Sequence, residues 1–151
     1  MSEDERLRSI LDLKTVAIVG MSKDPSKYAH KVGAYLKSHG YKIIPVNPFA
    51  DEILGEKSYK SLLEMPDEIQ KNIEFVDIFR PSEDIPPIVE QAIQLKRKHG
   101  KLKAVWMQLG IINEKAAEQA RNSGLAVVMN RCIMIEHKRL KDGKEEARLL
   151  A

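Results

Sequence analysis

Five short apolar runs alternate along the chain with segments in which apolar residues recur every three or four positions. The runs are rich in β-branched residues, end at polar turn residues, and span 15–20, 41–48, 75–79, 103–107 and 125–129. Because they are apolar at nearly every position, they are typical of strands that are buried on both faces of a sheet. The sequence therefore predicts five strands with helices packed on either side.

The segments between these runs have the period of amphipathic helices. One short helix precedes the first run, a second ends near Gly40, a third runs roughly over 84–98, and a fourth begins at Asn113 and ends at Gly124. Ser82 is expected to cap the third helix and Asn113 the fourth, because short polar side chains accept hydrogen bonds from the first free N–H groups of a helix. The sequence thus predicts a strand and a helix in regular alternation.

This alternation favours right-handed crossovers and a mainly parallel sheet. We therefore expect an α/β fold, a three-layer Rossmann-like single domain over 1–151, with strand order 3-2-1-4-5 when the five runs are numbered along the chain. That order places a ligand crevice at the carboxyl ends of the first and fourth strands, where the winding reverses. The stretch 49–66 is expected to be a longer connection with a short helix near Leu62, and the charged C-terminal tail to be helical.

Five loops are expected to converge on this crevice, because each follows the carboxyl end of a strand. They are Gly20-Met21-Ser22-Lys23, Asn47-Pro48, Phe79-Arg80-Pro81, Gln108-Leu109-Gly110 and Asn130-Arg131-Cys132. A glycine after a strand permits a tight turn, and free N–H groups at the start of the following helix bind phosphate. Gly20, the Ser22 hydroxyl and a nearby lysine, with Lys27 preferred over Lys23 and Lys31, therefore predict an anion site. The alternative is a turn glycine beside lysines that only solvate the surface.

The first loop is not a dinucleotide fingerprint. The G-x-G-x-x-G pattern needs glycines where Ser22 and Pro25 stand, and NAD binding favours an acidic residue after the second strand, where the chain has Asn47-Pro48. An NAD(P)-binding regulator or oxidoreductase that uses the same crevice is therefore the alternative rather than the first hypothesis.

The other candidate residues each have two interpretations. Arg80 either reaches the crevice or pairs with an acidic residue of its own helix, and Gly110 either admits a flat ring or pantetheine arm or only serves a turn. Cys132 is a nucleophile only if a base lies beside it, and no spacing connects it to His30 or His137. A half-buried structural cysteine is the preferred interpretation. The four histidines do not have the spacing of metal ligands.

Charge and composition narrow the class of protein further. The net charge is +3, with acidic and basic residues mixed along the chain, so nothing indicates nucleic-acid binding. No apolar run is long enough for a bilayer, the N-terminus has no signal-peptide pattern, and a single cysteine excludes an internal disulfide, so a cytoplasmic protein is expected. A homodimer is expected only because C₂ dimers are the commonest assembly.

Seven short motifs in order carry a resemblance to a known family. They are Val16-Ala17-Ile18-Val19-Gly20-Met21-Ser22, Asp24-Pro25-Ser26-Lys27, Pro45-Val46-Asn47-Pro48, Glu52-Ile53-Leu54-Gly55, Val76-Asp77-Ile78-Phe79-Arg80, Val105-Trp106-Met107-Gln108-Leu109-Gly110-Ile111 and Asn130-Arg131-Cys132. Together they resemble the small stand-alone CoA-binding proteins, which are similar to the N-terminal domain of the succinyl-CoA synthetase α subunit. The resemblance extends from about Leu13 to Leu140.

The resemblance implies that coenzyme A is the bound cofactor, and it assigns the loops to parts of that molecule. Gly20, Met21, Ser22 and Lys27 would hold the phosphates; Val46, Asn47, Pro48, Phe79 and Arg80 would border the adenosine; Met107, Gln108, Leu109 and Gly110 would meet the pantetheine; Asn130 and Cys132 would close the far side.

Two departures from the synthetase limit what the resemblance implies. The synthetase has a nucleotide-binding lysine shortly after its second strand, whereas this chain has Phe49-Ala50-Asp51 there, so Lys23, Lys27 or Arg80 must supply the positive charge. The sequence also lacks the second domain that bears the phosphorylated histidine. We therefore expect a non-enzymatic carrier, sensor or regulatory module. An enzyme that acts on acyl-CoA or on a CoA disulfide through Cys132 is a further alternative.

Overall fold

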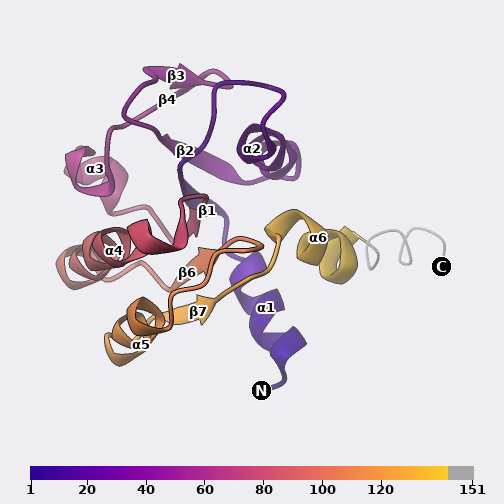
Figure 1. The fold of residues 1–151 in the computed structure, drawn as a ribbon, viewed down its shortest axis with the longest axis vertical. Helices are drawn as coiled ribbons and strands as arrows, with labels where there is room; N and C mark the ends of the chain where they lie inside the picture. Colours follow the sequence, from indigo (N-terminus) through magenta and orange to yellow (C-terminus); the bar gives the residue numbers. More distant parts are fainter. Residues whose placement is uncertain (143–151) are drawn as a thin grey trace.

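Five parallel strands form the centre of the molecule, and each lies within one of the five predicted runs (Figure 1). The structure is a computed structural model that describes residues 1–142. The strands are β1 (Thr15–Val19), β2 (Lys42–Val46), β5 (Phe75–Ile78), β6 (Ala104–Met107) and β7 (Ala126–Val128). The predicted helical tail is described only to residue 142, and the rest of it lies outside the described residues.

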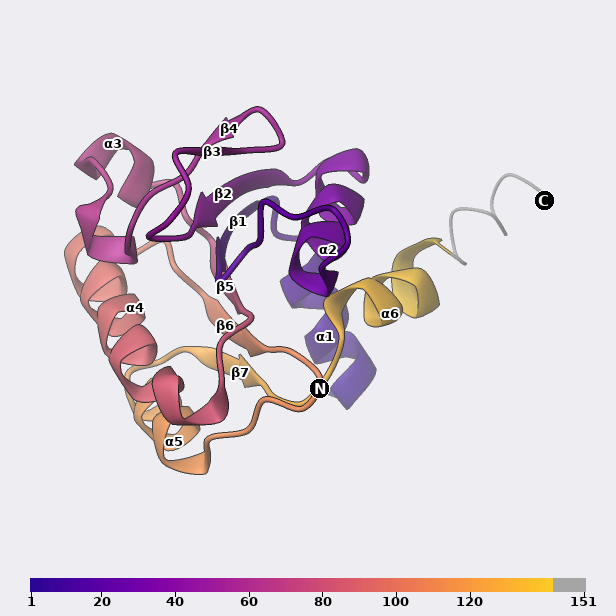
Figure 2. The ribbon, with the colours of Figure 1, turned by 45° about the horizontal axis from the view of Figure 1, so that its top comes forward.

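Helices cover both faces of this sheet, as the sequence predicts (Figure 2). On one face lie α1 (Glu3–Leu11), α2 (Tyr28–Ser38), α6 (Ile133–His137) and the short π-helical segment η3 (Lys138–Asp142). On the other face lie α4 (Ile85–His99), α5 (Glu114–Asn122), the 3₁₀ turn η1 (Leu62–Glu64) and the short helix α3 (Asp67–Gln70). None of the helices in this part of the chain is long and apolar enough to cross a membrane.

The two layers exist because successive strand residues point to opposite faces of the sheet. In β1, Val16 and Ile18 pack against α1, α2 and α6, whereas Ala17 and Val19 pack against the α4 side. All four of these side chains are buried. The continuous apolar runs are therefore explained by burial on both faces, which is what places the sheet in the middle.

The strand order differs from the predicted order. The sheet runs β2-β1-β5-β6-β7, which is 2-1-3-4-5 in the numbering of the five runs, so the prediction of 3-2-1-4-5 was wrong. Pro45 explains the difference, because proline has no N–H to give to a ladder and belongs on an edge strand. In β2 the Pro45 carbonyl faces outward and accepts from the Tyr59 N–H at 3.1 Å, whereas the Val46 carbonyl accepts from the Gly20 N–H on the β1 side.

The corrected order moves the reversal of winding. After β2 the chain returns past β1 through the hairpin β3 (Glu52–Ile53) and β4 (Glu56–Lys57), η1 and α3, and then forms β5 on the other side of β1. The crevice therefore opens at the carboxyl ends of β1 and β5 rather than of the first and fourth strands. This edge of the sheet carries the loops that were predicted to converge.

The two predicted caps had different outcomes. Asn113 caps α5, because its Oδ1 accepts from the Ala116 N–H at 3.0 Å. The prediction that Ser82 caps α4 was wrong: Ser82 begins a 3₁₀ turn, η2 (Ser82–Asp84), and its hydroxyl accepts from the Ile112 N–H at 3.0 Å. Two prolines follow Ile85 in the first turn of α4, and since they lack N–H groups they leave little to cap.

Candidate functional site

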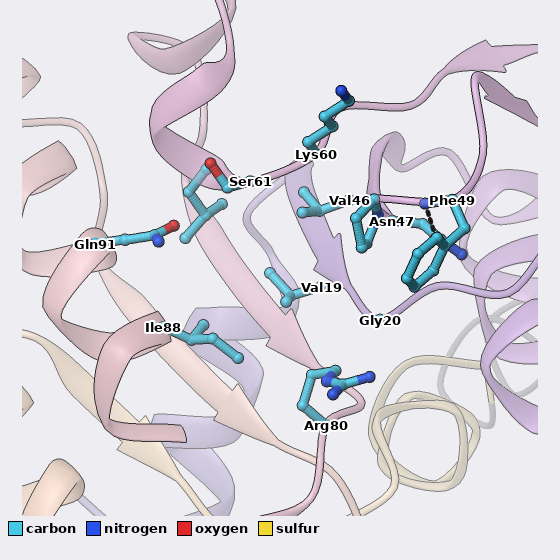
Figure 3. A pocket seen from close by; sticks show the side chains of 12 residues that line it. Val19, Gly20, Val46, Asn47, Phe49, Lys60, Ser61, Arg80, Ile88 and Gln91 are labelled. Atoms are coloured by element: carbon cyan, nitrogen blue, oxygen red, sulfur yellow. Dashed lines mark hydrogen bonds between the residues drawn. The ribbon is translucent and has the colours of Figure 1, made fainter. Parts of the chain in front are cut away.

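Two pockets open side by side at the carboxyl edge of the sheet and share Gly20 and Arg80. The β2-side pocket, about 470 Å³, is lined by Val19, Gly20, Val46, Asn47, Pro48, Phe49, Lys60, Ser61, Leu62, Arg80, Ile88 and Gln91 (Figure 3). The α2-side pocket, about 460 Å³, is lined by Gly20, Ser22, Lys27, Tyr28, Ala29, Phe79, Arg80, Pro81, Gln108, Leu109 and Ile111. Each is of the size that small ligands occupy.

The charged residues that line these pockets are all cations. Lys60 and Arg80 line the β2-side pocket, and Arg80 and Lys27 line the α2-side pocket. Within residues 1–142, no aspartate or glutamate lines either pocket. The remaining surface is largely apolar, so the combined groove suits a long ligand that is anionic in part and apolar in part.

Gly20 lies where the two pockets meet, and two independent constraints require a glycine there. Its φ of +85° is a left-handed conformation, and a Cβ at this position would lie 2.5 Å from the Phe79 carbonyl oxygen. The approach is close because β1 and β5 are neighbours whose loops leave the sheet together. The missing side chain leaves a cradle of bare backbone between the two pockets.

The N-terminus of α2 opens into the α2-side pocket without a cap. Lys27 is the N-cap residue and makes no side-chain cap bond, and the first turn contains no acid. No hydrogen bond to the Tyr28 or Ala29 N–H occurs among residues 1–142, and both residues line the pocket. Free N–H groups at the positive end of a helix dipole attract an anion.

These donors lie farther along the chain than the sequence predicts. The helix begins at Tyr28 rather than directly after Gly20, and the loop between them is held by its own side chains. The Ser22 hydroxyl accepts from the Asp24 N–H at 3.1 Å, and the Asp24 carboxylate accepts from the Ser26 N–H and hydroxyl. The hydrogen bonds from Ser26 lower the pKa of Asp24, and the positive charge of Lys27 at the start of α2 lowers it further.

Arg80 satisfies both of its predicted interpretations. It lines both pockets, and its Nη2 donates to the Asp84 Oδ2 at 2.8 Å. Both partners are about half exposed, and exposed ion pairs of this kind contribute less than about 1 kcal/mol. A phosphate in the groove can therefore share the guanidinium at little cost.

Ten of the fifteen predicted site residues line the two pockets: Gly20, Ser22, Lys27, Val46, Asn47, Pro48, Phe79, Arg80, Gln108 and Leu109. They come from four of the five loops that were predicted to converge. The other five predicted residues line neither pocket.

Three of those five, Met21, Met107 and Cys132, are buried in the core. The Met21 side chain is fully buried against Gly33 of α2, and only its carbonyl, which accepts from the Asn47 Nδ2 at 2.9 Å, faces the neighbouring loop. Met107 is fully buried on the α4 side of the sheet. Gly110 and Asn130 instead join two loops, since the Gly110 N–H donates to the Asn130 Oδ1 at 2.7 Å.

Cys132 is buried, with 2% exposure, rather than half-buried as the sequence predicts. Its thiol hydrogen-bonds the hydroxyl of Tyr28, which lines the α2-side pocket. Burial, together with the contact to Cys132, raises the pKa of Tyr28 above its usual value, so this hydroxyl stays protonated at neutral pH and is not available to take the proton of the thiol. The His30 Nδ1 donates to the Ser22 carbonyl, and His137 hydrogen-bonds Tyr35, so neither acts on the thiol.

Asp77 of β5 lies beneath this part of the site and was not singled out from the sequence. Its carboxyl group is fully buried, and neither oxygen has a partner within ordinary hydrogen-bond geometry. Burial raises the pKa of Asp77 well above its usual value, and the nearby Ile78 N–H and Gln108 amide offset only part of the rise. The Gln108 Oε1 accepts from the Ile133 N–H at 3.0 Å, which ties the loop after β6 to the start of α6.

The sequence did not predict the residues that close the far wall of the β2-side pocket. They are Phe49, Lys60, Ser61, Leu62, Ile88 and Gln91. They come from the long connection after β2 and from one face of α4 (Figure 3). Only the short helical pattern near Leu62 pointed to order in that connection, and no local pattern placed it beside the site.

Residues 14–138 match the family model described as the CoA binding domain. The chain belongs to this CoA-binding family. The protein YneT of Bacillus subtilis, described as uncharacterized, is 36% identical over 124 residues, which are 82% of this chain and 85% of that protein.

A further relative and a solved structure are similar as well. An ADP-forming acetate–CoA ligase of Methanocaldococcus jannaschii is 31% identical over 139 residues, which are 87% of this chain but only 19% of the ligase. The structure of a hypothetical protein from Pyrococcus horikoshii superposes with a TM-score of 0.81 at 41% identity and covers 92% of each chain.

The site of this CoA-binding domain fits the chemistry of coenzyme A. The cofactor joins a 3′-phosphorylated adenosine, a diphosphate and an apolar pantetheine arm. The site offers a backbone cradle that a Cβ would fill, free helix N–H groups, cations and two apolar pockets. No acidic side chain lines the groove to repel the phosphates.

Proposed function

We propose that this chain binds coenzyme A, or an acyl-CoA, across the two joined pockets and acts without catalysis as a carrier, sensor or regulatory module. The adenosine would occupy the β2-side pocket, the diphosphate would lie at the junction, and the pantetheine arm would follow the α2-side pocket. The observation that carries the proposal is that Gly20 and Arg80 belong to both pockets. A ligand that fills both must pass that bare backbone.

The diphosphate end is supported by three kinds of donor around the junction. Arg80 offers a planar guanidinium, Lys27 an ammonium, and the start of α2 two free N–H groups. Hydrogen bonds between charged donors and phosphate are stronger than neutral ones. Lys23 and Lys31 line neither pocket, so they are not part of the proposal.

The apolar walls support the two ends of the ligand. Val19, Val46 and Ile88 offer apolar contacts for an adenine ring in the β2-side pocket. Phe79, Leu109 and Ile111 offer such contacts for the pantetheine arm in the α2-side pocket. Leu109 is 61% exposed, so a ligand that covers it removes apolar surface from water.

The absence of a base beside Cys132 favours binding over chemistry. The thiol contacts Tyr28 rather than a histidine or a carboxylate, and its side chain lies below the pocket lining. The ligase that this chain resembles is about five times longer than the matched segment, so its reaction is not transferred to this chain.

A thermal-unfolding titration with CoA, NAD and NADP tests the proposal against the dinucleotide alternative. Neither pocket presents an acid to the ribose hydroxyls of NAD. At a hundredfold excess over its Kd, CoA should raise the free energy of unfolding by about 2.7 kcal/mol, and NAD and NADP should not. A stabilisation by NAD without one by CoA would overturn the proposal.

A further inference from the structure

Three cations are spaced along the groove, and their order matches the order of the phosphates in coenzyme A. Lys27 stands in the α2-side pocket, Arg80 at the junction, and Lys60 in the β2-side pocket. Lys60 and Arg80 lie on opposite sides of the β2-side pocket, and the Lys60 side chain extends away from Arg80 (Figure 3). A diphosphate at the junction accounts for Arg80 and Lys27 but leaves Lys60 without an assigned role.

We propose that Lys60 binds the 3′-phosphate of the cofactor and is the residue that selects coenzyme A over its 3′-dephospho form. This inference rests on the proposed function, because it assigns a partner to one phosphate of that ligand. The 3′-phosphate is the one charged group at the adenosine end of the molecule, and Lys60 is the one cation of the described residues that lines this pocket away from the junction.

Backbone contacts hold Lys60 at the end of β2, although its side chain is exposed. The preceding residue, Tyr59, forms an isolated parallel bridge with Val46. The Tyr59 N–H donates to the Pro45 carbonyl at 3.1 Å, and the Tyr59 carbonyl accepts from the Asn47 N–H at 2.9 Å. On the other side of Lys60, Leu62 is 1% exposed and anchors η1 in the core.

The Lys60 ammonium has no competing partner in residues 1–142. No ion pair or hydrogen bond of this side chain occurs there, whereas Arg80 is paired with Asp84 and Lys37 with Glu56. The residues directly after β2 do not supply a cation, since Phe49-Ala50-Asp51 stands there. Lys60 therefore replaces, from a distant part of the connection, the positive charge that this stretch lacks.

The test uses calorimetry to compare the affinities of CoA and dephospho-CoA for the whole protein and for three variants, Lys60→Gln, Lys60→Arg and Lys57→Gln. The wild type should bind CoA roughly tenfold more tightly than dephospho-CoA, which corresponds to about 1.4 kcal/mol, because the 3′-phosphate would accept a charge-assisted hydrogen bond from Lys60. Lys60→Gln should remove that preference by weakening CoA alone. Lys57→Gln is the matched control, because Lys57 is an exposed lysine of the same connection that lines neither pocket.

The outcomes separate this inference from the proposed function. If the wild type binds neither CoA nor dephospho-CoA, the proposed function itself fails. If it binds both equally well, or if Lys60→Gln retains the preference for CoA, the role of Lys60 is overturned while CoA binding stands. If Lys57→Gln weakens CoA as much as Lys60→Gln, the effect is general electrostatics and the role of Lys60 is again overturned. A Lys60→Arg variant that keeps the preference confirms that the charge is what matters.

Discussion

Gly20 shows at the scale of one residue how two separate constraints act on a backbone position of the candidate site. The left-handed φ excludes most side chains, and the closeness of Phe79 excludes even a methyl group. Gly40 has a similar φ of +88°, but no atom lies within 4 Å of the position that a Cβ would occupy there. A side chain at Gly40 would therefore meet only the strain of the left-handed backbone, whereas one at Gly20 would also collide with Phe79.

Gly20→Ala should destabilise the protein by more than Gly40→Ala does. Gly40→Ala should cost about 1–2 kcal/mol of unfolding free energy from the left-handed backbone alone. Gly20→Ala adds a contact with a backbone oxygen that cannot move aside, so we expect roughly 1–3 kcal/mol more, and weaker CoA binding. Urea denaturation measures both losses, and equal losses would contradict the close approach.

Asp77 lies beneath the candidate site, and its protonation state affects the stability of the fold. It is buried in β5 between β1 and β6, with Ile18 and Trp106 as its neighbours in the sheet. Tyr28 lies near enough that the Asp77 charge contributes to the raised pKa of its hydroxyl. A carboxyl group in such surroundings is stable as the neutral acid.

Asp77→Asn should therefore stabilise the protein at neutral pH and have little effect in acid. The pKa of Asp77 is raised on folding. The protonated Asp77 therefore contributes fully to the free energy of unfolding below its unfolded pKa of about 3.9, and this contribution is lost as pH rises toward the folded pKa. Above about pH 3.9, the free energy of unfolding of Asp77→Asn should exceed that of the wild type by a margin that grows by up to about 1.4 kcal/mol per pH unit, until the folded pKa is reached. Denaturant unfolding of both proteins between pH 4 and 8 measures it, and parallel curves would show that Asp77 is ionised in the fold.

At the scale of the element, α2 differs from α1 and α5, the described helices whose N-cap side chains accept a hydrogen bond, and shares the lack of such a cap bond with α3, α4 and α6. Ser2 accepts from the Glu5 N–H at α1, and Asn113 accepts from the Ala116 N–H at α5, with acids in the first turn of each. The N-terminus of α2 has neither a cap bond nor an acid and faces a pocket. The start of α2 therefore lacks the stabilisation that a cap bond would give, at the place where we propose that the ligand phosphate binds.

Lys27→Asp should make the protein more stable and weaken its binding of CoA. An aspartate at the N-cap supplies the missing acceptor and should stabilise the protein by about 0.5–2 kcal/mol. It also blocks the free N–H groups and reverses a charge, so CoA affinity should fall by roughly tenfold or more. Lys23→Asp is the control, because this exposed lysine lines neither pocket and should change neither quantity much. Unfolding curves and CoA titrations of both variants decide it, and an unchanged affinity in Lys27→Asp would remove α2 from the site.

At the same scale, Pro45 is the sequence signal that decides the strand order. The apolar runs predict which segments are strands, but they do not state which strands are neighbours. Pro45 has no N–H to donate on the side of β2 that faces away from β1, so a full ladder to another strand cannot form there and β2 is suited to the edge of the sheet. The edge position of this strand could have been predicted from Pro45 in the sequence, and that prediction would have corrected the strand order.

At the scale of the whole molecule, the reversal of winding between β1 and β5 creates the site. The connections after β1 and β5 leave toward opposite sides of the sheet. Their loops therefore diverge and leave room for two pockets that meet at Gly20. The long connection after β2 then folds back along the edge of the sheet and completes one of them. The proposed ligand would bridge three segments that are far apart in sequence.

Local patterns in the amino-acid sequence specify the five strands, the helices on both faces, the glycine at the junction and most of the loop residues around it. These features follow from periodicity, turn chemistry, and the convergence of carboxyl ends in a parallel sheet. The folded chain was needed for the strand order, the burial of Met21, Met107 and Cys132, and the arrival of Lys60 at the β2-side pocket. Those depend on which distant segments pack together, and packing is a property of the whole chain that no short window of sequence contains.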